Sequence, residues 1–470
     1  MSIVADIYLQ GASMSIDRRI FLGQMGLGVG AAAMPWLSLL HPVSCLGKEP
    51  RRASLLKITS MKVTPIALPD PPILAHGGCH GPYFLRNIVQ ISTDAGIQGI
   101  GETHGGAAVT EHLERAARLV VGESAFAYRK LARPLSELSN ACYAGIELAC
   151  LDACGKATRR RLCELLGGPV REDVEFSAYL FYRYAADHPK LLADPRIVDS
   201  RGRGDKALDA WGEVRTPAAM AEMAEKFRAK YGFRNFKLKA GVLPVETELA
   251  TMREMNERFS GKYPLRIDPN GRWKVETAVA AAKSLRELPL EYYEDPVLGQ
   301  EPMAQVRKAT GLKMSTNMCV TRFEHIAAAV RTQPIDIVLG DHHGWGGITA
   351  VQSLGRLCEA LGWGLSQHSN NHAGITMAAM VHVAAVTPQL TYASDTHYPW
   401  LVEGADVIRG PNLKFEGGKM KVPPAPGLGV ELDDDKLARA HEVYRKCGMT
   451  RRDDAATMRL IEPDWQPVLF

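Results

Sequence analysis

Two lysines at alternate positions, Lys237 and Lys239 in "YGFRNFKLKAG" (231–241), have a residue type and a spacing that could serve catalysis. The segment otherwise has the character of a buried strand, and side chains two residues apart on a strand share one face. Neighbouring ammonium groups repel each other, which lowers the pKa of one lysine until it can act as a base near neutral pH. The alternative is an exposed strand face that carries two solvated lysines.

Polar side chains also end the strand-like runs that follow these lysines: "PLRIDPN", "LEYYEDP", "LKMSTNM", "DIVLGD", "WGLSQHS" and "LTYASDT". The polar residues are Asp268, Glu294, Asn317, Asp341, His368 and Asp395. Each alone has a structural explanation, because aspartate before proline favours a turn, asparagine caps helices and histidine can lie in a core. Their recurrence at successive strand ends is hard to explain by turns alone and indicates a shared pocket.

Three of these residues offer only oxygen ligands, namely Asp268, Glu294 and Asn317. Such a set suits a hard, octahedral divalent ion such as Mg²⁺. Because asparagine replaces a third carboxylate, the ligands carry two negative charges and leave the ion more positive for an anionic substrate. Lys239 would stand on one side of the ion. On the other side would stand His368, oriented by the neighbouring aspartate in a carboxylate–imidazole pair.

Strand and helix patterns alternate from residue 174 onward, and these elements must position the polar residues. Eight short β-rich runs, beginning with "VEFSAYLF" and "FRNFKLKA", are each followed by a helical stretch. Eight consecutive βα units are typical of a TIM barrel, whose active site lies at the C-terminal ends of the strands. A doubly wound open sheet also alternates the two patterns, but eight regular units favour the closed barrel.

The rest of the chain is predicted to cap this barrel. "KITSMKVTPIAL" and "RNIVQISTDAGIQGIGE" are typical of strands, and residues 111–166 have the periodicity of about three helices, which together indicate an α+β unit. The proline- and glycine-rich "VPPAPGLGVELD" and a final helix leave the barrel and are expected to return to this unit. The predicted organisation is a signal segment and linker (1–50), a capping domain (51–173), the barrel (174–400) and the C-terminal return (401–470).

The composition is that of a soluble globular protein, with 46% hydrophobic and 23% charged residues. A net charge of +4 without basic clusters next to stacking aromatics argues against a nucleic-acid partner. The nine cysteines form no CxxC pair and are expected to be buried free thiols. The protein is therefore expected to fold in a reducing compartment.

The N-terminal stretch "SIDRRIFLGQMGLGVGAAAMPWLSLL" resembles a twin-arginine export signal, with Arg18 and Arg19 before a weakly apolar run. Such signals export proteins that are already folded, so we expect a periplasmic protein with no stable membrane partner beyond the export machinery. Retention as an uncleaved anchor is an alternative, and a cytoplasmic location follows if this interpretation fails. Because "MSIDRR" begins at Met14, the first thirteen residues could precede the true start.

A family resemblance rests on motifs that run in order through the chain: "CHGPYFLRNIV", "FKLKAGV", "DPNGRW", "YYEDP", "STNM", "HSNNHAGIT", "SDTH", "PGLGVELD" and "RRDDA". Over residues 57–466 the sequence resembles the enolase superfamily of mandelate racemase and muconate lactonizing enzyme, and within it the glucarate dehydratase branch. The resemblance implies a TIM-type barrel with an α+β cap that the C-terminal segment completes.

The same resemblance implies roles for the polar residues. Lys239 would be one base with Lys237 as its electrostatic partner, and His368 with Asp341 would be the second acid/base. The three oxygen ligands named above would bind Mg²⁺. Substrate contacts are implied for Asn270, Ser369, Asn370, His397, Tyr179, His80 and Arg452.

The expected function is Mg²⁺-dependent dehydration of an aldarate-like, glucarate-related sugar acid to a 2-keto-3-deoxy acid, through α-proton abstraction and an enediolate intermediate. Alternatives are an acid-sugar epimerase or racemase, and a non-catalytic exported sugar-acid-binding protein. The partner would be a small-molecule acid sugar, and a homo-oligomer is expected. The chain is short between "VVGES" and "GIELACLD" compared with glucarate dehydratases, and "GDHHGWGGIT" also departs from their pattern. We therefore expect a conserved chemistry with a different distal pocket.

Overall fold

The computed structural model describes residues 56–198 and 211–470. The predicted export signal, including Arg18 and Arg19, lies outside these residues. So does part of the polar segment that follows the first barrel strand. None of the described helices is long and apolar enough to cross a membrane.

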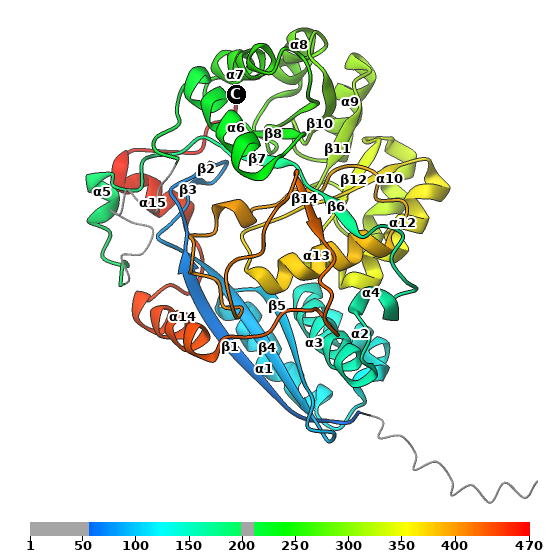
Figure 1. The fold of residues 1–470 in the computed structure, drawn as a ribbon. Coiled ribbons are helices and arrows are strands. Elements are labelled where there is room, and N and C mark those ends of the chain that lie inside the picture. The colour runs from blue at the N-terminus through cyan, green and yellow to red at the C-terminus, as the bar shows by residue number, and fades with distance from the viewer. Residues whose placement is uncertain (1–55, 199–210) are drawn as a thin grey trace, which may run out of the picture. The chain divides into compact units, whose positions relative to one another are not determined.

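The described chain begins with a three-stranded antiparallel sheet in the order β1-β4-β5 (Figure 1). Its strands are β1 (Ile58–Pro69), β4 (Tyr83–Thr93) and β5 (Gln98–His104), and its main helices are α1 (Ala107–Val120) and α3 (Asn140–Thr158). Gly99 and Gly101 let α3 approach β5, because a Cβ atom at either position would lie 2.0 Å from a backbone oxygen of α3. We call this sheet with α1 and α3 the cap.

Short elements complete this part of the chain. They are β2 (Leu74–Ala75), β3 (Gly78–Cys79), η1 (Ala125–Leu131), α2 (Ala132–Ser136), α4 (Leu162–Leu165), β6 (Asp173–Glu175) and α5 (Pro189–Leu192). The hairpin of β2 and β3 projects towards the barrel, where the carbonyl oxygen of His76 accepts a 2.8 Å hydrogen bond from Arg272.

The second sheet has seven parallel strands whose spatial order follows the chain order. They are β7 (Ala178–Phe181), β8 (Phe236–Lys239), β9 (Leu265–Asp268), β10 (Leu290–Glu294), β11 (Met314–Thr316), β12 (Ile337–Gly340) and β13 (Gly364–Gln367). Parallel neighbours in chain order require a helix-containing crossover between each pair. This curled parallel sheet with an N-terminal cap confirms the predicted fold class.

The prediction of an eighth strand, "LTYASDT", is wrong, although this segment lies where an eighth strand would lie, between β13 and β7. Residues 390–396 form only isolated bridges, from Leu390 to Leu365 beside β13 and from Ser394 to Phe176 beside β7. A continuous ladder fails because the carbonyl oxygen of Ala393 accepts hydrogen bonds from the side chains of Arg266 and Ser366 instead. The segment thus connects both edges of the sheet without being a strand.

Helices follow the barrel strands. The longer ones are α6 (Pro217–Tyr231), α7 (Val245–Arg258), α8 (Val275–Leu285), α9 (Gln300–Thr310), α10 (Ile326–Thr332), α12 (Ile348–Leu361) and α13 (Gly374–Val386), and the short ones are η2 (Phe323–His325), α11 (His342–Trp345) and η3 (Tyr398–Trp400). Every residue of α13 is buried, unlike the amphipathic α12. Helix α13 therefore has neighbours on all sides, and the cap supplies some of them.

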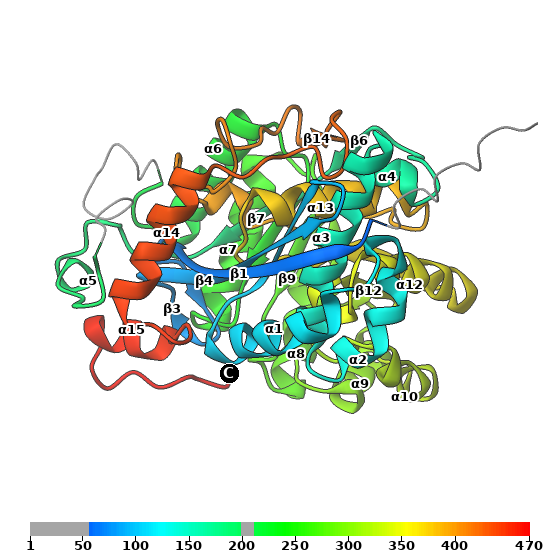
Figure 2. The same ribbon diagram turned by 90° about the horizontal axis from the view of Figure 1, so that it is seen from below.

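The C-terminal segment returns to the cap. Strand β14 (Lys419–Lys421) pairs with β6, and α14 (Asp434–Cys447) lies beside β1 before α15 (Asp454–Ile461) ends the helical structure (Figure 2). The α14 side chain of Val443 packs with Ala67 of β1 and Leu85 of β4. The C-terminal segment therefore adds to the apolar packing of the cap sheet.

Helix α12 begins against a carboxylate of the cap. Glu147 of α3 is fully buried and accepts a 2.5 Å hydrogen bond from the backbone N–H of Ile348 and another from the hydroxyl of Thr349. Burial raises the pKa of Glu147 from 4.5 to about 7, and these hydrogen bonds offset only part of that shift. The group therefore takes up a proton on folding at intermediate pH.

This shift predicts a pH-dependent component of stability. The unfolded carboxyl loses its proton near pH 4.5 and the folded one near pH 7, so the stabilisation present below pH 4.5 is lost as the pH rises towards 7. The loss amounts to ~3 kcal/mol, at about 1.4 kcal/mol per pKa unit. Urea unfolding from pH 5 to pH 8 should show this component in the parent protein and not in Glu147→Gln. The surface variant Glu137→Gln serves as the control and should keep it, and an unchanged profile in Glu147→Gln would contradict the assignment.

Candidate active site

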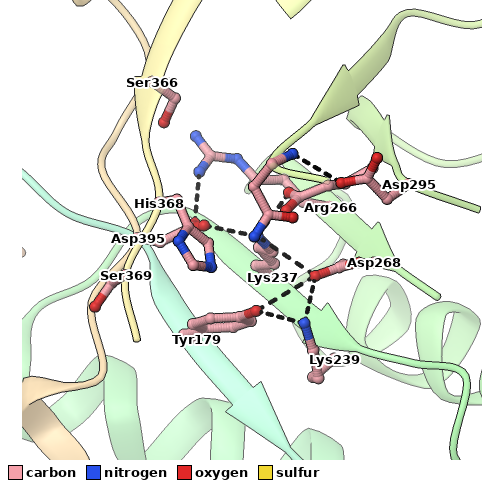
Figure 3. Close-up of polar contacts among 12 residues, drawn as sticks. Tyr179, Lys237, Lys239, Arg266, Asp268, Asp295, Ser366, His368, Ser369 and Asp395 are labelled. Atoms are coloured by element: carbon pink, nitrogen blue, oxygen red, sulfur yellow. Dashed lines mark hydrogen bonds and ion pairs between the residues drawn. The ribbon is translucent and has the colours of Figure 1, made fainter. Parts of the chain in front are cut away.

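The polar strand ends meet at the C-terminal edge of the parallel sheet (Figure 3). Lys239, Asp268 and Glu294 are the last residues of β8, β9 and β10, while Asp341 and His368 directly follow β12 and β13. Carboxyl ends of neighbouring parallel strands lie side by side, so a pattern of strand ends in the sequence becomes a single site in space.

Lys237 is fully buried and is not part of a solvated strand face. Its Nζ lies 2.6 Å from Glu294 Oε2, 2.6 Å from Asp395 Oδ2 and 3.7 Å from Asp268 Oδ2. Burial alone would lower the pKa of Lys237, but these three carboxylates raise it above its usual value. Lys237 is therefore held as a cation. Asp395, a strand-end residue to which the sequence assigned no role, is one of its counterions.

Lys239 shares a carboxylate oxygen with Lys237. Its Nζ lies 2.8 Å from Asp268 Oδ2 and 2.9 Å from the hydroxyl oxygen of Tyr179, which itself lies 3.3 Å from the same Oδ2 (Figure 3). An ammonium group can only donate, so the Tyr179 hydroxyl accepts from Lys239 and donates to Asp268. Although burial would raise it, Lys239 and Lys237 lower the pKa of Asp268 to about 2.

The three predicted oxygen ligands lie at the ends of neighbouring strands, and two of them present acceptor atoms that have no donor among the described residues. Glu294 Oε1 and Asn317 Oδ1 are buried and have no hydrogen-bond partner among the described residues. Burial raises the pKa of Glu294 well above its usual value, and the nearby Asp268 raises it further. Unpartnered buried acceptors are costly unless a cation or donor satisfies them. The donor set of two carboxylates and one amide is that of a hard divalent ion.

Asp295, beside Glu294, is a further buried carboxylate that the sequence did not single out. It accepts hydrogen bonds from the backbone N–H of Asn317 at 2.7 Å and from the Thr316 hydroxyl. Burial and the charge of Asp268 raise the pKa of Asp295 to about 7. Asp295 thus fixes the backbone that carries Asn317, a role visible only once the loop is folded.

The side chains of the predicted acid/base pair, His368 and Asp341, are in hydrogen-bond contact. His368 Nδ1 lies 3.1 Å from Asp341 Oδ2, and the backbone N–H of His343 donates to Asp341 Oδ1 at 2.9 Å. Burial favours the neutral carboxyl, but hydrogen bonds from His343 and His368 hold the pKa of Asp341 well below its usual range. Because Nδ1 of His368 faces the carboxylate, its Nε2 is the nitrogen left for a substrate.

Comparisons with known proteins show the family to which this chain belongs. Residues 61–167 match the family model for the mandelate racemase/muconate lactonizing enzyme N-terminal domain, and residues 219–436 match the enolase C-terminal domain-like model. A Streptomyces coelicolor protein named "Probable glucarate dehydratase" is 42% identical over 437 residues, which cover 87% of this chain and 97% of that protein. The chain belongs to the enolase superfamily. It is a glucarate dehydratase-like enzyme of that superfamily.

Solved structures of the superfamily show the same fold. An enolase from Pseudomonas fluorescens with bound magnesium, potassium and tartrate is 39% identical, with a TM-score of 0.82 over 88% of this chain and 98% of that chain. One from Mycobacterium smegmatis complexed with tartrate is 41% identical, with a TM-score of 0.80 over 87% of this chain and 97% of that chain.

The substrate residues implied by the enolase-superfamily resemblance divide into two groups. The first lies beside Lys239, where the ring of Tyr179 is 4.9 Å from that of His397 and the His397 backbone donates to Ser369 at 3.1 Å. Asn270 belongs here too, but it donates to Asp268 Oδ1 through both its backbone and its side chain. In this structure Asn270 therefore orients a proposed metal ligand.

The second group lies between the cap, the barrel and the C-terminal segment. Arg452 pairs with Asp454 at 2.8 Å and donates to Asn371 at 2.9 Å. His80 lies 3.4 Å from Asp70 and 3.8 Å from Asp454. Arg452 and Asn370 line a cavity of about 580 Å³. Asn370 also lines a smaller cavity together with Asp341 and His368.

Proposed function

We propose that the protein is a Mg²⁺-dependent dehydratase of an aldarate-like sugar acid and forms a 2-keto-3-deoxy acid. One observation carries the proposal: Lys239 and the His368–Asp341 pair stand at the ends of separate strands. At the ends of strands between them lie Glu294 Oε1 and Asn317 Oδ1, which have no hydrogen-bond partner in the described part of the chain. Two groups able to transfer protons and a cation site between them are what α-proton removal from a carboxylic acid requires.

Mg²⁺, when bound to Asp268, Glu294 and Asn317, would supply the positive charge that stabilises the developing anion of the substrate carboxyl group. Lys239 Nζ, once it has lost a proton and is the free amine, or His368 Nε2 of the neutral imidazole takes the α-proton, according to the configuration of the α-carbon. His368 is an imidazolium at this point, either because it took the α-proton itself or, where Lys239 took it, because it entered the reaction protonated. It then gives the Nε2 proton to the departing β-hydroxyl oxygen, so that the C–O bond breaks and water leaves. The resulting enol tautomerises to the 2-keto-3-deoxy acid.

The class of substrate is supported by the relatives. Tartrate, bound in the Pseudomonas fluorescens and Mycobacterium smegmatis structures, is a dicarboxylate with a hydroxyl on each α-carbon. We place the far end of such a molecule towards the cavity beside Arg452, because Asn370 lines both that cavity and a smaller one that contains His368. Glucarate is the reference substrate, but the short cap segment favours an acid sugar that differs from it at the distal end.

Epimerisation of an acid sugar is a second candidate, because two bases on different strands can remove and return a proton on opposite faces. Incubation with a panel of acid sugars, followed by assay of 2-keto-3-deoxy acids, separates the two. Dehydration requires a keto product from at least one member of the panel. Epimers without any keto product would instead establish the racemase-like reaction.

We also propose that residues 1–50 direct export through the twin-arginine pathway, on the pattern of Arg18 and Arg19 before the apolar run. A fusion of residues 1–50 to a reporter active only outside the cytoplasm should give signal. The double change of Arg18 and Arg19 to lysine keeps the charge and should abolish the signal. A fusion that begins at Met14 should export as well as the longer one, and normal export of the double variant would rule the pathway out.

A further inference from the structure

A line of buried hydrogen bonds connects the cap to the acid/base pair. Asp341 Oδ1 lies 3.0 Å from Nδ1 of His343, whose other nitrogen, Nε2, lies 3.1 Å from Arg86 Nη2 on strand β4 of the cap. Arg86 Nε donates to Glu102 Oε1 at 2.7 Å. The side chains of Arg86 and Glu102 are 3% and 0% exposed, so water does not compete for these bonds.

Glu102 anchors this line to the barrel. Its carboxylate accepts the backbone N–H groups of Ala373 at 2.9 Å and Thr376 at 2.8 Å, at the N-terminus of α13. Burial would raise the pKa of Glu102, but Arg86 and these donors lower it to about 2. Glu102 is therefore an anion that holds Arg86 in place and caps the helix that follows His368.

The partners of His343 select one of its tautomers. A guanidinium can only donate, so Arg86 requires a lone pair on Nε2, and the proton then lies on Nδ1 and is donated to Asp341. The opposite tautomer would donate to the Glu102 carbonyl oxygen at 3.3 Å, but it would place lone pairs against Asp341 and hydrogens against Arg86. The Nδ1–H form satisfies both shorter contacts, and they are the contacts to charged groups.

The surroundings keep His343 neutral. The ring of His342 lies 4.0 Å from that of His343 and the ring of His104 lies 4.8 Å away. Burial, with a smaller contribution from Arg86, lowers the pKa of His343 to about 4, although Asp341 opposes this shift. A neutral imidazole has one N–H group, and His343 donates it as a hydrogen bond to Asp341.

A bound metal is the competing explanation, because ligand atoms of His104, Asp341 and His343 lie within 4.8 Å of one another. A protonated Nδ1 cannot bind a cation, and the Nε2 of His343 faces the guanidinium of Arg86 at 3.1 Å. The cluster is therefore accounted for by hydrogen bonds.

We infer that Arg86 and His343 are positioning residues of the acid/base pair, through which the cap orients Asp341. Two donors from His343 occupy Asp341 Oδ1, so Oδ2 faces His368 Nδ1 and fixes its proton there. His368 Nε2 then presents its lone pair to the substrate. The inference deepens the proposed function and rests on the role given there to His368.

The tautomers can be tested without any substrate. Long-range ¹H–¹⁵N correlation on the full chain, labelled with ¹⁵N-histidine and loaded with Mg²⁺, reports which nitrogen of each ring carries the proton. We expect Nδ1–H on both His343 and His368 in the parent protein. An Nε2–H tautomer on His343 would overturn the inference by itself, whatever reaction the enzyme catalyses.

A matched pair of variants tests the consequence. Asn and Leu are nearly isosteric, and Asn places a donor where His343 has Nδ1, so His343→Asn should keep the Nδ1–H tautomer of His368 and His343→Leu should lose it. Deuterium exchange from D₂O into each α-epimer of an acid sugar supplies a second readout. In His343→Leu we expect His368-dependent exchange to fall about 10- to 100-fold and Lys239-dependent exchange to stay within about twofold of the parent. In His343→Asn we expect His368-dependent exchange to be restored.

The outcomes separate a positioning role from a structural one. If both exchanges fall equally in His343→Leu, or if His343→Asn fails to restore the first, the inference is wrong. If the parent protein exchanges neither epimer of any acid sugar, the proposed function is wrong, and the tautomers of His343 and His368 still decide the inference. Should His343→Leu not fold, the parent spectrum and His343→Asn remain decisive.

Discussion

We expect Glu294→Gln to bind a divalent ion at least about 100-fold more weakly than the parent protein and to lose turnover by on the order of 10³-fold. Glu294 Oε1 is a buried acceptor without a hydrogen-bond partner among the described residues, and glutamine replaces one carboxylate oxygen by an NH₂ group that cannot bind a cation. Lys237 keeps Asp395 at 2.6 Å, so the change does not leave its charge unpaired. Mn²⁺ titration followed by electron paramagnetic resonance measures the affinity separately from turnover.

Asp341→Asn is the matched control, because it alters the acid/base pair and no proposed metal ligand. It should bind Mn²⁺ as the parent does while turnover falls. Full turnover after exhaustive chelation, or an unchanged Mn²⁺ affinity in Glu294→Gln, would contradict the metal assignment.

The second large effect is stereochemical. Lys239→Ala should lose exchange of the α-proton of one epimer with D₂O by about 10²- to 10⁴-fold and keep exchange of the other, and His368→Asn should show the reverse. The reason is geometric, because Lys239 and His368 approach from strands β8 and the end of β13, on different sides of the proposed metal ligands. NMR detection of deuterium in each recovered epimer makes the measurement.

Tyr179→Phe provides the comparison for this pair, since it removes a 2.9 Å contact of Lys239 but neither base. It should reduce Lys239-dependent exchange without abolishing it. Equal exchange into both epimers by Lys239→Ala would refute the assignment of two bases.

The grouping of the site residues could be predicted from the sequence because they recur at the ends of successive parallel strands. Residues at the ends of parallel strands converge whatever the helices between them, so Lys239, Asp268 and His368 could be grouped from their positions alone. The pairing of Lys237 with Asp395 joins residues 158 positions apart and depends on how the sheet curls. A separation of 127 positions likewise hid the hydrogen bond from the Arg266 side chain to the backbone of the eighth predicted strand.

His343 shows a second limit of sequence reasoning. The run "GDHHGWGG" contains two adjacent histidines, and nothing local says which of them faces Asp341. The choice is made by α11, where Asp341 caps the helix and turns His343 Nδ1 towards its own carboxylate, and by Arg86 from the cap. A residue whose role depends on two separate parts of the chain carries no motif of its own.

The cap carboxylates Glu102 and Glu147 complete the N-termini of barrel helices α13 and α12, which follow the strands of the acid/base pair. This arrangement limits which segments of this chain can be exchanged for those of a relative. A barrel given the cap of a distant relative would lose these helix caps and the guanidinium beside His343 together, so both its folding and its proton transfer would suffer. Recombination that alters substrate preference should therefore succeed when its crossover points lie within loops of the cap, such as the short segment after α1. The recombined chain should keep Arg86, Glu102 and Glu147 together with the barrel helices and the histidine that they contact.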